Sequence, residues 1–127
     1  MYKYDPYTLE KILSIPKNIE LNPRNSFCIC YAEINQLFVD IHITFDDLLN
    51  ALQESPHFIS QWLTYSENKR TSNGWFVRQV ESGKYEVGFY DGKGIVDNLF
   101  FNDSVAACAL FISKEITSVS GGVEGMG

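Results

Sequence analysis

The chain has 127 residues, of which 45% are hydrophobic, and its formal net charge is −6. A chain of this length is expected to form a single domain that buries roughly two-thirds of its unfolded surface, so it needs no disulfide or metal to fold. The acidic balance argues against direct binding to nucleic acid, because phosphate contacts need a basic face. It favours a basic protein partner, although mild acidity also serves solubility alone.

The cysteines and the apolar runs bear on where the protein acts. Cys28, Cys30 and Cys108 are odd in number and lack the spacing of a disulfide framework, so we interpret them as small buried thiols in a reducing compartment. No stretch reaches the roughly 18 apolar residues of a membrane span. The N-terminus lacks the apolar region of a signal peptide. The sequence therefore predicts a cytoplasmic protein.

The first predicted helix covers about residues 6–14. Asp5 suits its cap and Pro6 its first turn, where a backbone N–H has no helical partner in any case. Pro16 is expected to end this helix, because proline cannot continue a helix interior. Residues 16–25 are then expected to form an irregular connection.

Residues 26–38 fit two different structures. Their apolar positions recur at helical spacing, yet the same residues also fit two short strands around Asn35-Gln36. The helical match is longer, so a helix is the favoured interpretation.

Two further helices are predicted from their first turns. Thr44, with Asp47 three residues later, resembles a capping box that starts a helix over about 45–54. Ser55 suits the cap of another helix over about 56–66, whose apolar residues recur at helical spacing.

Three strands and a final helix follow. Alternating apolar side chains between turn residues predict strands over about 75–80, 84–90 and 95–101. A capped stripe at helical spacing predicts a helix over about 104–117. The Gly-rich segment 118–127 is expected to be a flexible tail.

Together these elements predict a single α+β domain over residues 1–117. The strands form a three-stranded antiparallel meander, and the helices over 45–54, 56–66 and 104–117 are expected to pack on one of its faces. The other face is expected to stay solvated or to serve in binding.

Few residues suit catalysis or metal binding. His42 and His57 have no cysteine or second histidine at metal-ligand spacing, and nothing near Cys28 activates it as a nucleophile. The Asp46-Asp47 pair lies in a helix first turn, where it complements the helix dipole. The run Gly92-Lys93-Gly94 links two strands, so a hairpin turn is favoured over a phosphate cradle. We therefore predict a non-enzymatic protein without metal or cofactor.

The polar run Glu67–Asn73 has two interpretations. It is a solvated connector whose side chains cap the preceding helix, or a recognition segment in which Lys69 or Arg70 binds a carboxylate elsewhere. Trp75 follows closely and begins the first strand. The sequence leaves both interpretations open.

Several runs between residues 43 and 116 share the pattern of one protein family. They are Trp62, YSENKRTS over 65–72, GWFV over 74–77, YEVGFY over 85–90, and an AACALF helix after a strand that ends in Phe101. In these runs the chain resembles small bacterial immunity proteins. Such proteins accompany polymorphic toxins, including those of contact-dependent growth inhibition.

The resemblance implies a cytoplasmic protein that binds a cognate toxin domain one-to-one and neutralises it by occlusion. Many such toxins are nucleases with basic substrate grooves, which suit an acidic inhibitor. Immunity interfaces vary with the toxin, so no binding residue transfers by motif. Charge and position instead suggest these partner-binding candidates: Glu67, Glu81, Glu86, Tyr90, Asp91, Asp97 and Asp103.

Two alternative functions remain open from the sequence. The first is a regulatory or adaptor domain that binds other proteins without enzymatic activity. The second is a small enzyme or ligand-binding domain, which requires a concave pocket with convergent polar groups. Cys28, Cys30 or His42 would then line that pocket.

Overall fold

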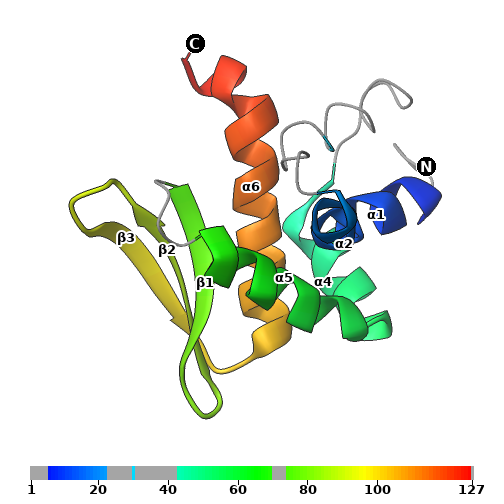
Figure 1. Cartoon of the computed structure of the whole chain (residues 1–127), viewed down its shortest axis with the longest axis horizontal. Helices are drawn as coiled ribbons and strands as arrows, with labels where there is room; N and C mark the ends of the chain where they lie inside the picture. Colours follow the sequence, from blue (N-terminus) through cyan, green and yellow to red (C-terminus); the bar gives the residue numbers. More distant parts are fainter. Residues whose placement is uncertain (1–5, 23–29, 31–42, 70–73, 127) are drawn as a thin grey trace.

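A computed structural model of the chain describes residues 6–22, 30, 43–69 and 74–126. The predicted α+β fold is confirmed, because three antiparallel strands form one sheet in the order β1-β2-β3 and helices precede and follow it (Figure 1). The elements in chain order are α1 (Pro6–Leu13), α2 (Ile15–Leu21), α4 (Phe45–Glu54), α5 (His57–Lys69), β1 (Gly74–Glu81), β2 (Lys84–Tyr90), β3 (Ile95–Phe101) and α6 (Ser104–Met126).

Two tight turns connect the strands, as predicted. Gly83 lies in the β1–β2 turn with a φ of 75°, and Gly92 lies in the β2–β3 turn with a φ of 96°. Residues with a side chain rarely adopt positive φ angles of this size, so glycine suits both positions. In the second turn, the Asp91 carboxylate accepts hydrogen bonds from the backbone N–H groups of Lys93 and Gly94, at 2.8 and 3.0 Å. The run over residues 92–94 is therefore a hairpin turn.

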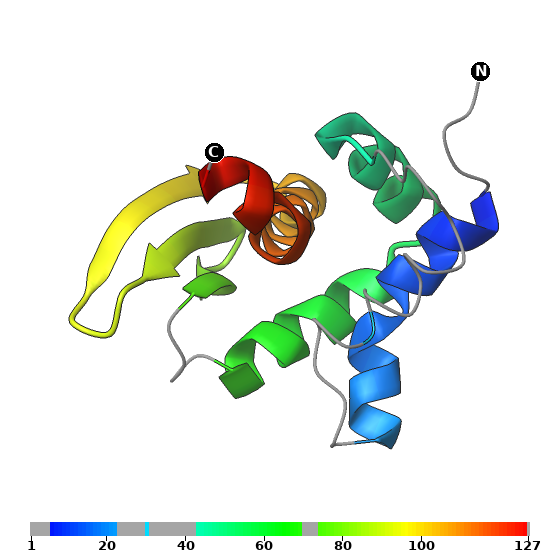
Figure 2. The same cartoon turned by 90° about the horizontal axis from the view of Figure 1, so that it is seen from above.

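The helices lie in layers against one face of the sheet (Figure 2). α6 packs mainly across β1 and β2, while α4 packs against α6. α5 packs against β1 and α6. The structure thus differs from the expectation that the helix over 45–54 lies on the sheet, because α6 occupies that place and α4 forms a layer behind it.

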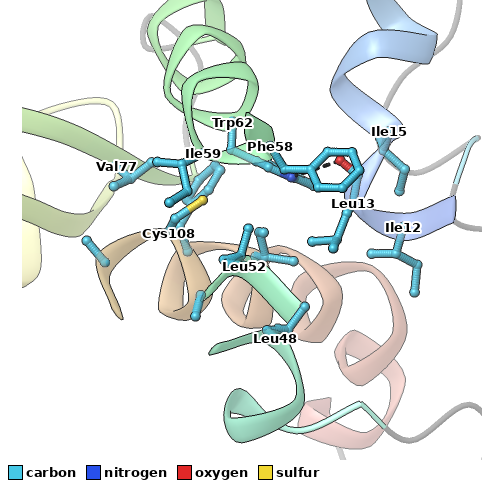
Figure 3. Close-up of a cluster of buried hydrophobic side chains, with 14 of the residues drawn as sticks. Ile12, Leu13, Ile15, Leu48, Leu52, Phe58, Ile59, Trp62, Val77 and Cys108 are labelled. Carbon is cyan, nitrogen blue, oxygen red and sulfur yellow. Dashed lines mark hydrogen bonds between the residues drawn. The ribbon is translucent and has the colours of Figure 1, made fainter. Parts of the chain in front are cut away.

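One hydrophobic core joins these layers (Figure 3). Trp62 of α5 is fully buried, and its indole N–H donates a hydrogen bond to the backbone carbonyl of Leu13 at 3.1 Å. That carbonyl lies at the C-terminal end of α1, where helix geometry leaves carbonyls without partners. Trp62 also meets the rings of Tyr65 and Phe111 edge to face. This one side chain therefore ties α5 to both α1 and α6.

A buried hydrogen bond also joins α5 to α6. The Tyr65 hydroxyl donates to the Glu115 carboxylate at 2.9 Å, and Glu115 is buried. Burial, together with the neighbouring carboxylate charge, raises the pKa of Tyr65 far above its usual range. The hydroxyl therefore stays protonated and keeps donating across the neutral pH range.

The predicted start of the helix over 45–54 is confirmed at α4. Thr44 Oγ1 accepts a hydrogen bond from the Asp47 backbone N–H at 3.1 Å, and the Asp47 carboxylate accepts one from the Thr44 backbone N–H at 2.9 Å. This reciprocal pair is a capping box, which satisfies N–H groups that the start of a helix leaves open. Leu48 and Leu52 then bring the helix into the core.

Residues 15–21 are helical, which corrects the irregular connection predicted over 16–25. Pro16 lies in the first turn of α2, where its missing N–H and its fixed φ are compatible with a helix. The proline therefore belongs to the start of a second helix, which Ser14 separates from α1. Ile15 and Pro16 are both buried, so they anchor α2 to the core.

Two helices continue past their predicted ends. α5 extends to Lys69, and the α6 backbone is helical to Met126. Lengthening an existing helix requires no new nucleus, so polar and Gly-containing segments are added at a modest cost per residue. The flexibility expected of 118–127 stays a prediction. The ambiguous segment 26–38 lies outside the described residues, apart from Cys30.

The cysteines that the structure describes are buried small side chains, as predicted. They are Cys30 and Cys108. Burial raises the pKa of the Cys108 thiol well above its usual range. Because the thiolate is the reactive form, this cysteine acts as a small core side chain.

Candidate functional site

The face of the sheet that points away from α6 is left uncovered by the described helices (Figure 2). The face that points toward α6 carries Val77 and Val87, which are buried against that helix. In the described part of the chain the sheet thus has one covered and one uncovered face, as predicted. We call the uncovered side the open face. Strand register places on it Phe76, Arg78, Glu86, Gly88, Tyr90, Asn98 and Phe100.

Glu86 lies in the middle strand of the open face but is itself only 2% exposed. Its two carboxylate oxygens accept hydrogen bonds from the neighbouring strands, one from Arg78 Nε at 2.7 Å and one from Asn98 Nδ2 at 2.8 Å. These bonds compensate for the removal of the carboxylate from water. Glu86 therefore links the three strands, and it is not the exposed acidic contact that its selection from the sequence assumed.

Phe76 covers Gly88 on the open face. A Cβ atom at Gly88 would lie 2.7 Å from the Phe76 ring and 2.8 Å from the backbone oxygen of Asp97. The site therefore requires glycine. The Arg78 guanidinium lies 5.5 Å from the centre of the Phe76 ring, within the range of a cation–π interaction. The small residue in the middle strand thus lets an aromatic ring lie close to the sheet.

A hollow of about 530 Å³ opens beside this group, between the end of α5 and the open face. It is lined by Ser66, Glu67, Phe76, Val77, Arg78, Tyr90 and Ile95. The wall combines two aromatic rings with one carboxylate and one guanidinium. Of the candidates chosen from the sequence, Glu67 and Tyr90 line this hollow, and Glu86 is bonded to the arginine in its wall.

Ser66 closes the β1 edge of the sheet beside this hollow. It is buried, and its Oγ accepts a hydrogen bond from the backbone N–H of Val77 at 2.8 Å. An edge strand otherwise presents such N–H groups to other chains. The end of α5 therefore blocks this edge at that position.

The remaining candidates lie at separate places on the sheet. Glu81 and Asp103 lie at the end where β1 and β2 are joined, and Asp91 lies at the opposite end. Asp97 is exposed on β3, on the face that α6 partly covers. The structure therefore does not gather all the candidates into one patch.

Two of these acidic residues also have structural roles. Asp91 holds the β2–β3 turn, and its hydrogen bonds with the N–H groups of Lys93 and Gly94 lower the pKa of its carboxyl. Asp103 Oδ1 accepts a hydrogen bond from the Val105 backbone N–H at 2.9 Å, which caps α6. Both side chains are exposed, so their negative charges also lie at the protein surface.

Sequence reasoning missed the exposed apolar side chains of β3. Ile95, Val96, Leu99 and Phe100 are all exposed, because β3 is an outer strand and α6 covers mainly β1 and β2. The run IVDNLFF has the composition of a buried strand, since apolar residues occupy both of its faces. The signal that could have identified them is the predicted meander order, which puts the third strand at an edge of the sheet.

The described residues contain no group of three or more histidine, cysteine or carboxylate side chains placed to hold a metal ion. His57 is exposed at the start of α5, where its ring meets that of Phe58. A second hollow, of about 340 Å³, lies between α2 and α5, and its described lining holds neither histidine nor cysteine. Outside the described part of the chain lie Asp5, Cys28, His42, Arg70 and the side chain of Lys69, so the roles expected for them stay predictions.

No protein-family model, no curated protein and no solved structure matches the chain. Along the residues that the structure describes, none of the helices combines the length and the apolar character needed to cross a membrane.

Proposed function

We propose that the protein is a non-enzymatic cytoplasmic inhibitor that binds a toxin domain and occludes it, in the manner of the immunity proteins that its sequence resembles. The supporting observation is the open face, where Phe76, Tyr90 and Arg78 surround a hollow. Aromatic residues and arginine are enriched in the cores of protein interfaces. The Glu86 hydrogen bonds hold this face in place from within the sheet, which lowers the ordering cost of binding.

The charge of the chain supports a basic partner. A net charge of −6 steers positively charged domains toward it. Glu67 and Asp91 are exposed near the ends of α5 and β2 that border the open face. Nuclease toxins carry basic substrate grooves, and an acidic domain that covers such a groove excludes the nucleic acid. Inhibition of this kind requires no catalytic residue in the inhibitor.

Several residues that carry the resemblance have structural roles. Trp62 fixes α5 in the core, Ser66 joins α5 to β1, and Gly88 admits the ring of Phe76. These residues shape a scaffold and leave the surface free to vary. A family of inhibitors that meet different toxins requires this division between a shared scaffold and a variable surface.

Co-expression with the C-terminal region of the protein encoded immediately upstream tests the proposal. That region alone should arrest growth, and this chain should restore growth and co-purify with it one-to-one. Tyr90→Ala removes a ring from the hollow and should weaken the complex by about 2 kcal/mol if Tyr90 is a hot spot. Leu21→Ala is the matched control, because Leu21 is 73% exposed on α2, which has no extensive contact with the sheet.

A separate experiment tests whether acidic side chains steer a basic toxin domain toward this protein. The double variant Asp91→Asn, Asp97→Asn removes two exposed charges and preserves side-chain shape. Its association rate with the toxin domain should fall at low salt and approach that of the wild type at high salt, because salt screens steering. An unchanged rate at low salt would contradict the steering role. Absence of both binding and rescue would contradict the toxin proposal and favour the regulatory or adaptor alternative.

A further inference from the structure

β3 is an apolar strand at an edge of the sheet. Its side chains Ile95, Val96, Leu99 and Phe100 are between 43% and 61% exposed. Strand register places Leu99 on the α6 side and Phe100 on the open face, so apolar groups lie on both sides of one strand. An open edge with this composition is a template for pairing with another chain.

The two edges of the sheet differ in how they are protected. At β1, the Ser66 hydroxyl accepts the Val77 N–H and the end of α5 packs alongside. Among the described elements, β3 pairs with β2 and meets α6, and nothing lies beyond its outer edge (Figure 1). β3 also has no lysine or proline, the residues that protect natural edges, and Asp97 is its single charged residue.

The sequence of β3 is self-complementary about Asn98. Two positions to either side lie Val96 and Phe100, and three positions to either side lie Ile95 and Phe101. Antiparallel pairing of two β3 strands centred on Asn98 therefore sets Val96 opposite Phe100 and Ile95 opposite Phe101, and apolar cross-strand pairs of this kind stabilise paired strands. A partner strand of unrelated sequence has no reason to match this symmetry.

The charges on the strand are compatible with a second copy as the partner. In the register centred on Asn98, Asp97 of each copy lies opposite Leu99 of the other, so like charges are not directly opposed. The register shift between β2 and β3 falls at Val96, the extra residue between the partners of Phe89 and Tyr90, and residues 97–101 pair regularly with β2. The net charge of −6 on each chain opposes association at long range, and salt screens this repulsion.

We propose that two copies of the chain pair antiparallel along β3 and form one continuous six-stranded sheet, with three strands from each copy. A two-fold axis perpendicular to the sheet relates the copies, which is the commonest symmetry of protein oligomers. Helix α6 of both copies then lies on one side of the sheet, and both open faces lie on the other. The dimer does not depend on toxin binding, and it presents two binding faces side by side.

Sedimentation equilibrium of the full chain over the micromolar range tests the dimer. The wild type should show twice the chain mass of 14.5 kDa, and added salt should tighten the dimer. Val96→Lys should weaken it by at least about tenfold, because the symmetry buries two ammonium groups, one from each copy. Val80→Lys is the matched control, since it makes the same change at an exposed valine of β1, the protected edge, and its dimer should persist.

Cross-linking gives a second readout, which stays valid if Val96→Lys fails to fold. Asn98→Cys places two thiols opposite each other across the axis, so oxidation by oxygen with a copper catalyst should join the copies through a disulfide. Wild-type chain treated identically is the control. A covalent dimer from Asn98→Cys alone would support the register.

Three results would overturn the proposal. The first is a wild type that stays monomeric at every concentration. The second is a dimer that Val96→Lys leaves intact, and the third is a dimer without the Asn98→Cys cross-link. In the first case, loss of toxin binding in Val96→Lys would assign the β3 edge to the toxin. Failure of the dimer leaves the rescue experiment unaffected, so the two proposals are separable.

Discussion

Replacing Ser66 with alanine tests whether the end of α5 seals the β1 edge. Ser66 is 1% exposed and Val77 is 2% exposed, so water has little access to replace the lost acceptor. The Val77 N–H, now bonded to Ser66 Oγ at 2.8 Å, would be left buried without a partner. Such a loss costs about 1–3 kcal/mol of the free energy of unfolding.

Helix propensity acts in the opposite direction. Alanine is favoured over serine in a helix by up to about 0.7 kcal/mol. The stability change of Ser66→Ala alone therefore underestimates the contribution of the Ser66–Val77 hydrogen bond. Ser60→Ala supplies the correction, because Ser60 lies exposed in the same helix with a long hydrogen bond of 3.4 Å to the His57 carbonyl. We expect Ser66→Ala to be less stable than Ser60→Ala by about 1–3 kcal/mol.

Urea unfolding followed by tryptophan fluorescence measures this difference in stability. Trp62 is buried in the core and Trp75 packs against the core, so unfolding changes the surroundings of both rings. In thermal unfolding, each kcal/mol should lower Tm by about 3–5 °C for a chain of this size. Hydrogen exchange at the Val77 amide should accelerate in Ser66→Ala and stay unchanged in Ser60→Ala. Equal stability and equal exchange in the two variants would refute the assignment of Ser66 as the seal of this edge.

Three further substitutions test individual contacts. Gly88→Ala should lower the free energy of unfolding by about 1–3 kcal/mol in urea, because the added Cβ overlaps a ring and a strand carbonyl, whereas Gly94→Ala, whose Cβ meets nothing within 4 Å, should change it little. Equal effects of Gly88→Ala and Gly94→Ala would contradict the explanation that close packing requires glycine at position 88. Thr44→Ala should cost about 0.5–2 kcal/mol in the same assay through loss of the helix cap, and unchanged stability would rule out that role. Tyr65 has a pKa that is raised in the folded state, so the unfolded chain loses this proton first and stability falls as pH rises above about 10, by up to about 1.4 kcal/mol per pH unit. Tyr65→Phe should remove that part of the slope in unfolding measured across this pH range, and identical slopes would disprove the linkage.

Local features of the fold were determined by the sequence alone. The capping box needs only Thr44 and Asp47, three positions apart, and the structure has both of its hydrogen bonds. The strands over 84–90 and 95–101 are bounded by turn residues that act on their immediate neighbours, and their observed bounds match the prediction. Pro16 shows the limit of such signals, because proline both ends one helix and suits the first turn of another.

The candidate site depended on contacts between residues far apart in the chain. Glu67 and Tyr90 were chosen for their chemistry, and the packing of α5 against β1 brings both to one hollow. Glu86 was chosen for its charge, but Arg78 and Asn98 on the flanking strands bond it and bury it. Charge and position in the sequence do not report such burial, because the burying groups come from other strands.

Tertiary structure alone decided which apolar residues face solvent. Leu99 and Leu52 are both leucines within predicted elements, yet Leu52 is fully buried and Leu99 is exposed. The difference arises because α4 packs against α6, whereas β3 extends past the surface that α6 covers. Periodicity along the chain sets which side chains share a face. Burial follows only when distant elements pack on that face, and this is why the exposure of the apolar side chains of β3 became apparent only in the folded chain.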